Sequence, residues 1–203
     1  MLAIVDYGVG NLFSLQSSFA AVGESAVVSS DPAVLRAADR LILPGVGAFR
    51  DAAEKLRQSG LDEIVRERTA AGTPLLGICL GMQLLFDNSL EYGDYPGLGL
   101  IPGSVRPIAE RVPAEYKIPH IGWNALRLTG DNPLFHRIQN GDCVYFVHSY
   151  HAVCEEKYIS ADTEYGGLLT AAVRRDNIYG CQFHPEKSGR VGLAILKSFC
   201  EDT

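Results

Sequence analysis

Apolar runs and amphipathic segments alternate along the first part of the chain. The apolar stretches Leu2–Val5 and Leu41–Leu43 are short enough to be buried strands. Between them, apolar residues return at helical spacing and end before Gly23, which predicts a helix with one buried face: Leu12, Leu15, Phe19 and Val22. A strand, a glycine-rich turn (Asp6–Asn11) and a helix in this order are typical of a βαβ unit.

The alternation continues as far as Cys79. Further elements are expected in this order: strand Ala26–Val28, a short helix that begins at Asp31-Pro32, helices at about 48–58 and 61–71, and strand Leu75–Ile78. Strands that alternate with helices predict a parallel sheet with helices on both faces. In such sheets, functional residues gather beyond the carboxyl ends of the strands.

The pattern changes after Asn88. Pro and Gly interrupt short segments from Gly93 to Gly141, and the later runs are typical of antiparallel strands: Val144–Val147, Ala171–Val173 and Ile178–Phe183. A last helix is expected around Val191–Phe199. We therefore predict a three-layer α/β fold, with a mostly parallel central sheet, helices on both faces and an added antiparallel layer.

Size and composition favour one domain that spans residues 1–203. A length of 203 residues and a hydrophobic content of 47% suffice for one buried core. The net charge of −6 leaves no basic face for a phosphodiester backbone, so we do not expect a nucleic-acid partner. No apolar run approaches the roughly 20 residues of a membrane span and no signal-peptide pattern is present, which predicts a cytoplasmic protein without a membrane partner.

The five cysteines do not resemble a disulfide framework or a zinc site. They form no C-x-x-C pair, and an odd number cannot all pair within the chain: Cys79, Cys143, Cys154, Cys181 and Cys200. Four histidines, His120, His136, His148 and His151, have no matching acid or ligand spacing. We expect neither a metal site nor a cofactor.

Cys79 has the surroundings of a nucleophile. The strand Leu75–Ile78 ends at this cysteine, Gly77 and Gly81 flank it at two residues on either side, and a helical pattern follows, as in a nucleophile elbow. The glycines remove Cβ atoms from a sharp strand-to-helix turn. The start of the next helix is expected to favour the reactive thiolate. A small buried cysteine would fit this loose pattern equally well if it stood alone.

His184 and Glu186 complete the expected catalytic group. They are two residues apart, so their side chains leave an extended backbone on the same side, and Pro185 favours that extended conformation. A carboxylate beside an imidazole orients the ring and stabilises its cation, and the ring can then accept the thiol proton of Cys79. The three residues predict a Cys-His-Glu triad for acyl transfer.

An acyl-transfer site also needs hydrogen-bond donors for an oxyanion. The backbone N–H of Leu80, directly after the nucleophile, is one candidate. The turn Pro44–Gly47 follows a neighbouring strand and offers the backbone of Val46 and Gly47, with Gly47 the preferred donor; an ordinary strand-to-helix turn is the alternative.

Three segments resemble the signatures of class I (triad) glutamine amidotransferases, in order and over nearly the whole chain: Pro44–Gly47, Gly77–Gln83 and Phe183–Glu186. Four others look like the glutaminase subunits of imidazole glycerol phosphate synthases, of histidine biosynthesis: Asp6–Asn11, Pro119–Asn124, Tyr145–Tyr150 and His184–Ser188. The resemblance implies a flavodoxin-like α/β fold and hydrolysis of L-glutamine to glutamate and ammonia through a glutamyl thioester on Cys79.

The resemblance also implies binding roles and a partner. It places Gln83 and the backbone of Gly45 near bound glutamine, flanked by Ser149 and Tyr150. It implies that ammonia passes to a cyclase subunit, a (β/α)8 barrel that makes imidazole glycerol phosphate and AICAR, within a heterodimer. The interface would then include Asn11, Trp123 and Lys187, although core packing is an equal alternative for Trp123 and a solvated side chain one for Lys187.

Two other functions stay open at this point. The chain could be the glutaminase subunit of another amidotransferase, such as anthranilate, aminodeoxychorismate or GMP synthase. It could also be a non-catalytic flavodoxin-like binding module in which Cys79 is incidental. A dinucleotide site in the Asp6–Asn11 turn is a weaker possibility, because the turn lacks the full G-x-G-x-x-G fingerprint.

Overall fold

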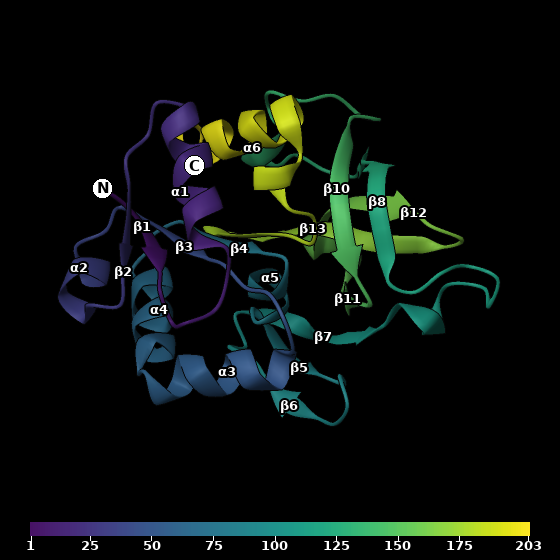
Figure 1. Cartoon of the computed structure of the whole chain (residues 1–203), viewed down its shortest axis with the longest axis horizontal. Coiled ribbons are helices and arrows are strands. Elements are labelled where there is room, and N and C mark those ends of the chain that lie inside the picture. Colours follow the sequence, from purple (N-terminus) through teal and green to yellow (C-terminus); the bar gives the residue numbers. More distant parts are fainter.

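A computed structural model describes residues 1–203, which form six α-helices, fourteen strands and four short 3-10 helices (Figure 1). The strands are β1 (Leu2–Val5), β2 (Ala26–Ser29), β3 (Arg40–Leu43), β4 (Leu75–Ile78), β5 (Phe86–Ser89), β6 (Tyr95–Pro96), β7 (Ile101–Pro107), β8 (His120–Ala125), β9 (Arg127–Leu128), β10 (Cys143–His148), β11 (Tyr150–Val153), β12 (Ile159–Glu164), β13 (Leu168–Arg175) and β14 (Ile178–Cys181). The helices are α1 (Leu12–Ala21), α2 (Pro32–Arg36), α3 (Phe49–Gln58), α4 (Leu61–Ala70), α5 (Leu80–Gln83) and α6 (Gly189–Glu201). The 3-10 helices are η1 (Ile108–Glu110), η2 (Pro133–Phe135), η3 (Glu156–Tyr158) and η4 (Pro185–Lys187).

A central sheet of eight strands has the order β2-β1-β3-β4-β14-β13-β12-β9. The first five strands are parallel and follow the 2-1-3-4-5 order of flavodoxin-like folds. The last three strands are antiparallel to their neighbours. The predicted α/β class with a parallel core is therefore confirmed.

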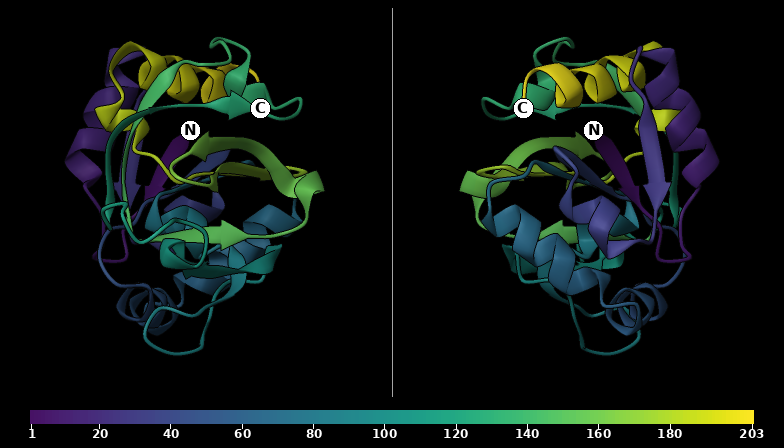
Figure 2. Two further views of the ribbon diagram at one scale, coloured as in Figure 1. Left: turned by 90° about the vertical axis from the view of Figure 1, so that its right-hand side faces the viewer. Right: turned by 90° about the vertical axis from the view of Figure 1, so that its left-hand side faces the viewer.

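Two apolar layers cover the two faces of this sheet. Alternate residues of β1 enter different layers: Ala3 and Val5 pack with α3 and α4, whereas Leu2 and Ile4 pack with α1 and α6. Figures 1 and 2 show α1 and α6 side by side on one face and α2, α3 and α4 on the other. The expected helices on both faces are present.

The expected antiparallel region is divided among three places. β13, β12 and β9 extend the central sheet instead of forming a separate layer. β8 pairs with β10 in a two-stranded sheet, and β11 joins β7, β5 and β6 in a four-stranded one. Sequence alternation indicates such strands but not their partners, because pairing depends on contacts between distant segments.

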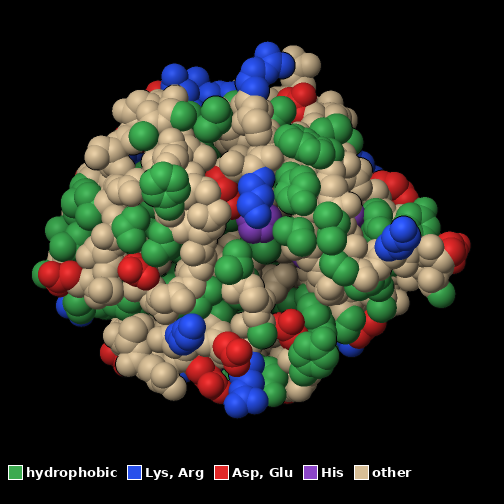
Figure 3. Space-filling view, in the orientation of Figure 1, with side chains coloured by type: hydrophobic (Ala, Val, Ile, Leu, Met, Phe, Trp, Pro, Cys, Tyr) green, Lys and Arg blue, Asp and Glu red, His purple; other side chains and the backbone are tan.

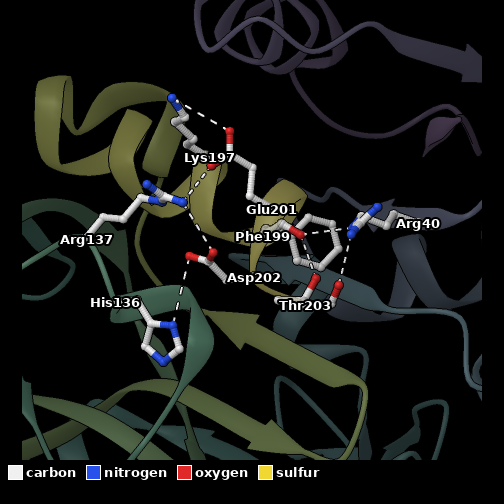
Figure 4. Close-up of polar contacts among 8 residues, drawn as sticks. All are labelled: Arg40, His136, Arg137, Lys197, Phe199, Glu201, Asp202 and Thr203. Atoms are coloured by element: carbon white, nitrogen blue, oxygen red, sulfur yellow. Dashed lines mark hydrogen bonds and ion pairs between the residues drawn. The ribbon is translucent and has the colours of Figure 1, made fainter.

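Polar contacts attach the end of α6 to the body of the molecule (Figure 4). Arg40, at the start of β3, donates from Nε to the Phe199 carbonyl (3.1 Å) and from Nη2 to the Thr203 carbonyl (2.9 Å). Arg137 donates to Glu201 (2.6 Å) and Asp202 (3.2 Å). These contacts fix the helix that follows His184 and Glu186 against the sheet.

Candidate active site

Cys79 lies at a sharp turn between β4 and α5. Its backbone has φ 55° and ψ −111°, a conformation that non-glycine residues rarely adopt. A Cβ at Gly81 would lie 1.8 Å from the Leu43 carbonyl oxygen, and one at Gly77 would lie 2.7 Å from the Gly81 carbonyl oxygen. Both glycines therefore allow the close backbone approach that the elbow requires.

The helix that is expected after Cys79 is present but short. α5 has four residues, Leu80–Gln83, and the chain soon enters β5. One helical turn carries only a small part of a helix macrodipole. The expected stabilisation of a thiolate by the helix is therefore weak here.

His184 and Glu186 meet directly after β14. The Glu186 Oε1 atom accepts a hydrogen bond from Nδ1 of His184 at 2.8 Å, and both side chains are almost fully buried. The His184 N–H donates to the Tyr145 carbonyl (3.0 Å), and the Ser188 hydroxyl donates to the His184 carbonyl (2.6 Å). These bonds hold the imidazole in one position with its Nδ1 committed to the carboxylate.

The charge of His184 is set by its neighbours. Burial acts to lower its pKa, but hydrogen bonds to Cys79 and Glu186, together with their negative charges, raise the pKa to about 9. The ring is thus an imidazolium at neutral pH, between a sulfur and a carboxylate. That arrangement supports a thiolate–imidazolium pair, the reactive form of a cysteine nucleophile.

A cavity of about 570 Å³ opens beside this group and is large enough for an amino acid. Cys79 and His184 both line it. Most of the other predicted site residues are also on its wall: Val46, Gly47, Leu80, Gln83, Ser149 and Tyr150. Residues that follow β3, β4 and β14 therefore converge on one cavity with residues of β10, as the carboxyl-end rule predicts for the parallel strands.

Gly45 is buried and is not one of the residues that line the cavity. A Cβ at this position would lie 2.8 Å from the Gly81 N atom, 2.9 Å from the Leu80 Cβ and 3.0 Å from the Tyr7 hydroxyl. Tyr7 donates to the Pro44 carbonyl at 2.6 Å. Gly45 therefore lets the Pro44–Gly47 turn pack tightly against the elbow, and Gly47 has φ +92°.

Two buried amide side chains connect the wall of the cavity with the sulfur. The Gln83 Nε2 donates to the Tyr150 carbonyl (3.3 Å) and to the Gln182 Oε1 (3.0 Å). The Gln182 Nε2 in turn contacts the Cys79 Sγ at 3.7 Å, within the range of hydrogen bonds to sulfur. The side chains of Gln83 and Gln182 therefore connect the wall of the cavity with the nucleophile.

Two neutral histidines support the same wall. The His148 Nδ1 donates to the Tyr150 carbonyl (2.8 Å), so its Nε2 accepts from the His120 Nδ1 (3.0 Å). Burial lowers the pKa of His148 to about 3 and that of His120 to about 4. The pair therefore stays uncharged at neutral pH and anchors the main chain of Tyr150.

The residues that the resemblance assigns to an interface lie on the surface. Trp123 is 58% exposed, so the alternative of core packing is wrong. Lys187 is exposed next to Glu186. Asn11 is exposed as well, and its side chain caps α1 by accepting from the Ser14 N–H at 3.2 Å.

Sequence reasoning missed Gln182, Tyr7 and Glu91. Gln182 directly follows the buried strand β14, and a polar residue in such a position is a usable signal. Glu91 lines the cavity and accepts from the Phe49 N–H at the start of α3 (2.6 Å), a contact between segments with no shared motif. The structure shows no group of three or more His, Cys, Asp or Glu side chains that could hold a metal ion.

Comparisons with known proteins agree with this geometry. The sequence profile of the family described as "Glutamine amidotransferase class-I" matches residues 3–203. The imidazole glycerol phosphate synthase subunit HisH of Lactococcus lactis subsp. lactis (strain IL1403) is 48% identical over 202 residues, which cover 99% of this chain and 98% of that protein. The HisH subunit of Sulfurimonas denitrificans is 50% identical over 201 residues, which cover 98% of this chain and 97% of that protein.

Solved structures share the fold at low identity. A crystal structure of a glutamine amidotransferase has a TM-score of 0.75 at 21% identity and covers 98% of both chains. The structure of PurLQS from Thermotoga maritima has a TM-score of 0.77 at 18% identity and covers 99% of this chain and 97% of that one. The chain belongs to the class-I glutamine amidotransferase family and, within it, to the HisH subunits of imidazole glycerol phosphate synthase.

Proposed function

We propose that this chain is a glutaminase, with Cys79, His184 and Glu186 as its catalytic triad and residues 1–203 as a single domain. The observation that carries the proposal is one cavity that contains both a cysteine at a strained elbow and an imidazole hydrogen-bonded to a buried carboxylate. A cysteine beside an imidazole that a carboxylate orients is the arrangement of a nucleophile activated for acyl transfer.

The chemistry follows from the charges of the resting site. The Cys79 thiolate attacks the side-chain amide carbon of glutamine, and the negative charge moves to the amide oxygen. His184 gives its proton to the departing nitrogen, so ammonia leaves and a glutamyl thioester remains. Water, with His184 now acting as base, hydrolyses the thioester to glutamate and restores the thiolate.

The Pro44–Gly47 turn and the Leu80 backbone are the proposed donors to the amide oxygen. Val46 and Gly47 line the cavity, and the positive φ of Gly47 is a conformation that glycine can leave or enter with little strain. We expect the isolated chain to be nearly inactive, with partner binding reorienting this turn. Full glutaminase turnover by the isolated chain would contradict that expectation.

The proposed partner is the (β/α)8 cyclase subunit, which would use the ammonia to make imidazole glycerol phosphate and AICAR in the cytoplasm. Its docking surface lies beside the cavity, where Ile118 and Pro119 form part of the cavity wall and Ile121 and Trp123 are more than half exposed. Figure 3 shows hydrophobic side chains gathered over β8 and β10 on this face. None of the helices combines the length and apolar character needed to cross a bilayer.

The test is a pair of assays on the complex with the cyclase. We expect Cys79→Ala to abolish product formation from glutamine and to leave product formation from ammonium salts intact. Loss of both activities would mean that Cys79 supports assembly instead of chemistry. As a control, Ser30→Ala changes an exposed residue just after the edge strand β2, away from β8 and β10, and should retain both activities.

A further inference from the structure

Gln182 is a fully buried polar side chain whose amide touches the reactive sulfur. Its exposed fraction is 0%, and its Nε2 lies 3.7 Å from the Cys79 Sγ. A primary amide can present either its NH2 group or its oxygen to a neighbour. Which of the two faces the sulfur decides whether Gln182 stabilises a thiolate or a thiol.

The surrounding hydrogen bonds settle this orientation. The Tyr150 carbonyl can only accept, so Gln83 must turn its NH2 group toward it (3.3 Å). The second hydrogen of the same NH2 group then requires an acceptor from Gln182, namely Oε1 at 3.0 Å. With its oxygen committed to Gln83, Gln182 is left to point its own NH2 group at Cys79.

The Tyr150 carbonyl, from which this series of hydrogen bonds starts, is itself held in place. The Tyr150 carbonyl also accepts from the His148 Nδ1 (2.8 Å), and His148 is fixed by the neutral His120 (3.0 Å). The orientation of Gln182 therefore does not depend on Cys79. It is imposed by Gln83 on α5 together with groups on β8, β10 and β11, and none of these hydrogen bonds requires an ionised sulfur.

We propose that Gln182 is a catalytic residue that stabilises the Cys79 thiolate by donating a hydrogen bond to it, with Gln83 as the positioning residue that keeps the donor toward the sulfur. A donor to an anionic sulfur is stronger than the same donor to a neutral thiol, so it favours the ionised form. The single turn of α5 supplies little of this stabilisation through its dipole. The inference rests on the proposed function only in taking Cys79 as the nucleophile.

The test measures the ionisation of the sulfur directly. Iodoacetamide alkylation of Cys79 in the full-length chain is followed by mass spectrometry of its peptide between pH 5 and 10. In this reaction the thiolate displaces iodide and a carbon–sulfur bond forms. We expect Gln182→Met to move the alkylation profile up by about one pH unit, so that alkylation below the midpoint is about tenfold slower. Gln182→Glu should move it further, because a carboxylate beside the sulfur repels the thiolate.

The alkylation rate at high pH, where it reaches a plateau, distinguishes a change in the ionisation of Cys79 from damage to the fold. Once the sulfur is fully ionised, all variants should be alkylated at rates within about twofold of the parent chain. Gln16→Met is the matched control, because the Gln16 Nε2 also donates to a carbonyl, that of Ala26 (2.9 Å), but on α1. Its profile should coincide with that of the parent. A Gln182→Met profile with an unmoved midpoint would overturn the proposal, whatever its plateau.

A second variant covers the case in which Gln182→Met does not fold. Gln83→Met leaves Gln182 in place and removes only the bond that orients it, so we expect a shift in the same direction but smaller, about threefold in rate below the midpoint. No shift in this variant would overturn the positioning role. These readouts need no glutamine, so they stay informative even if Cys79→Ala were to show that glutamine hydrolysis does not use this cysteine.

Discussion

At the scale of single residues, the site depends on the His184 ring, which is held between the Glu186 carboxylate and the Cys79 sulfur. His184 and Glu186 are both nearly buried, where an unpaired charge would be costly. The hydrogen bond between them, and the contact of His184 with Cys79, raise the pKa of the ring in spite of its burial. The protonation of this residue is therefore coupled to folding as well as to catalysis.

The pH dependence of stability should reveal this coupling. A folded pKa of about 9, above the ordinary value of 6.5, adds stability below pH 6.5 that is lost as the pH rises through 9. Glu186→Gln removes part of this contribution. We expect the variant to be less stable than the parent by on the order of 1 to 2 kcal/mol at pH 6. The difference should shrink toward pH 9.5 in urea unfolding, and a difference constant over this range would contradict the coupling.

The backbone at Cys79 gives a second residue-scale prediction. Its positive φ is unfavourable for any residue with a Cβ atom and is easily adopted by glycine. Cys79→Gly should therefore be more stable than Cys79→Ala, by about 1 kcal/mol in thermal unfolding, although glycine is normally the less stable of the two. Both variants lack the thiol, so neither should hydrolyse glutamine. A more stable alanine variant would show that the elbow is not strained.

At the scale of secondary-structure elements, the elbow is a close crossing of backbones from β3, β4 and α5. Gly81→Ala would place a Cβ 1.8 Å from the Leu43 carbonyl oxygen, and backbone cannot move aside cheaply. We expect a loss of at least about 3 kcal/mol, or failure to fold. Gly130→Ala is the control, because its Cβ meets nothing within 4 Å; it should change stability by less than about 0.5 kcal/mol. Denaturant unfolding of both variants checks the prediction.

The sequence predicts the parallel half of the fold and the triad well, because the signals for both lie in short continuous segments. Each of Cys79, His184 and Gly47 follows an apolar strand, so the rule about carboxyl ends is enough to bring them together. The length of α5 and the pairing of the antiparallel strands could not be read in this way. The amide of Gln182 was missed because its role depends on hydrogen bonds to Gln83 and Cys79, from a different part of the chain.

At the scale of the whole molecule, the exposed apolar side chains around the cavity are expected to contribute to binding of the cyclase but little to the stability of the fold. Trp123 is 58% exposed, and its ring lies edge to face with that of Tyr145, with the ring centroids 6.1 Å apart. Trp123→Ala should leave the unfolding of the isolated chain nearly unchanged but weaken binding of the cyclase by about 30-fold, equivalent to about 2 kcal/mol. Titration calorimetry with the cyclase measures this. Val27→Thr, an exposed residue on the edge strand β2, should not affect binding.

The length of the turn between β13 and β14 sets the register of β14 and so affects the catalytic group. Arg175 pairs with Ile178, so only Asp176 and Asn177 connect the two strands, and Asp176 has φ 53°. Successive side chains of a strand point to opposite faces of the sheet. If one amino acid were inserted here and shifted the register of β14 against β4 by one residue, each side chain of β14 would therefore move to the opposite face. The Gln182 amide and the His184 imidazole, which follow this strand, would then point away from Cys79. A hairpin turn whose residues do not line the cavity is thus constrained in length by the catalytic group, and redesign of this protein should leave its two residues untouched.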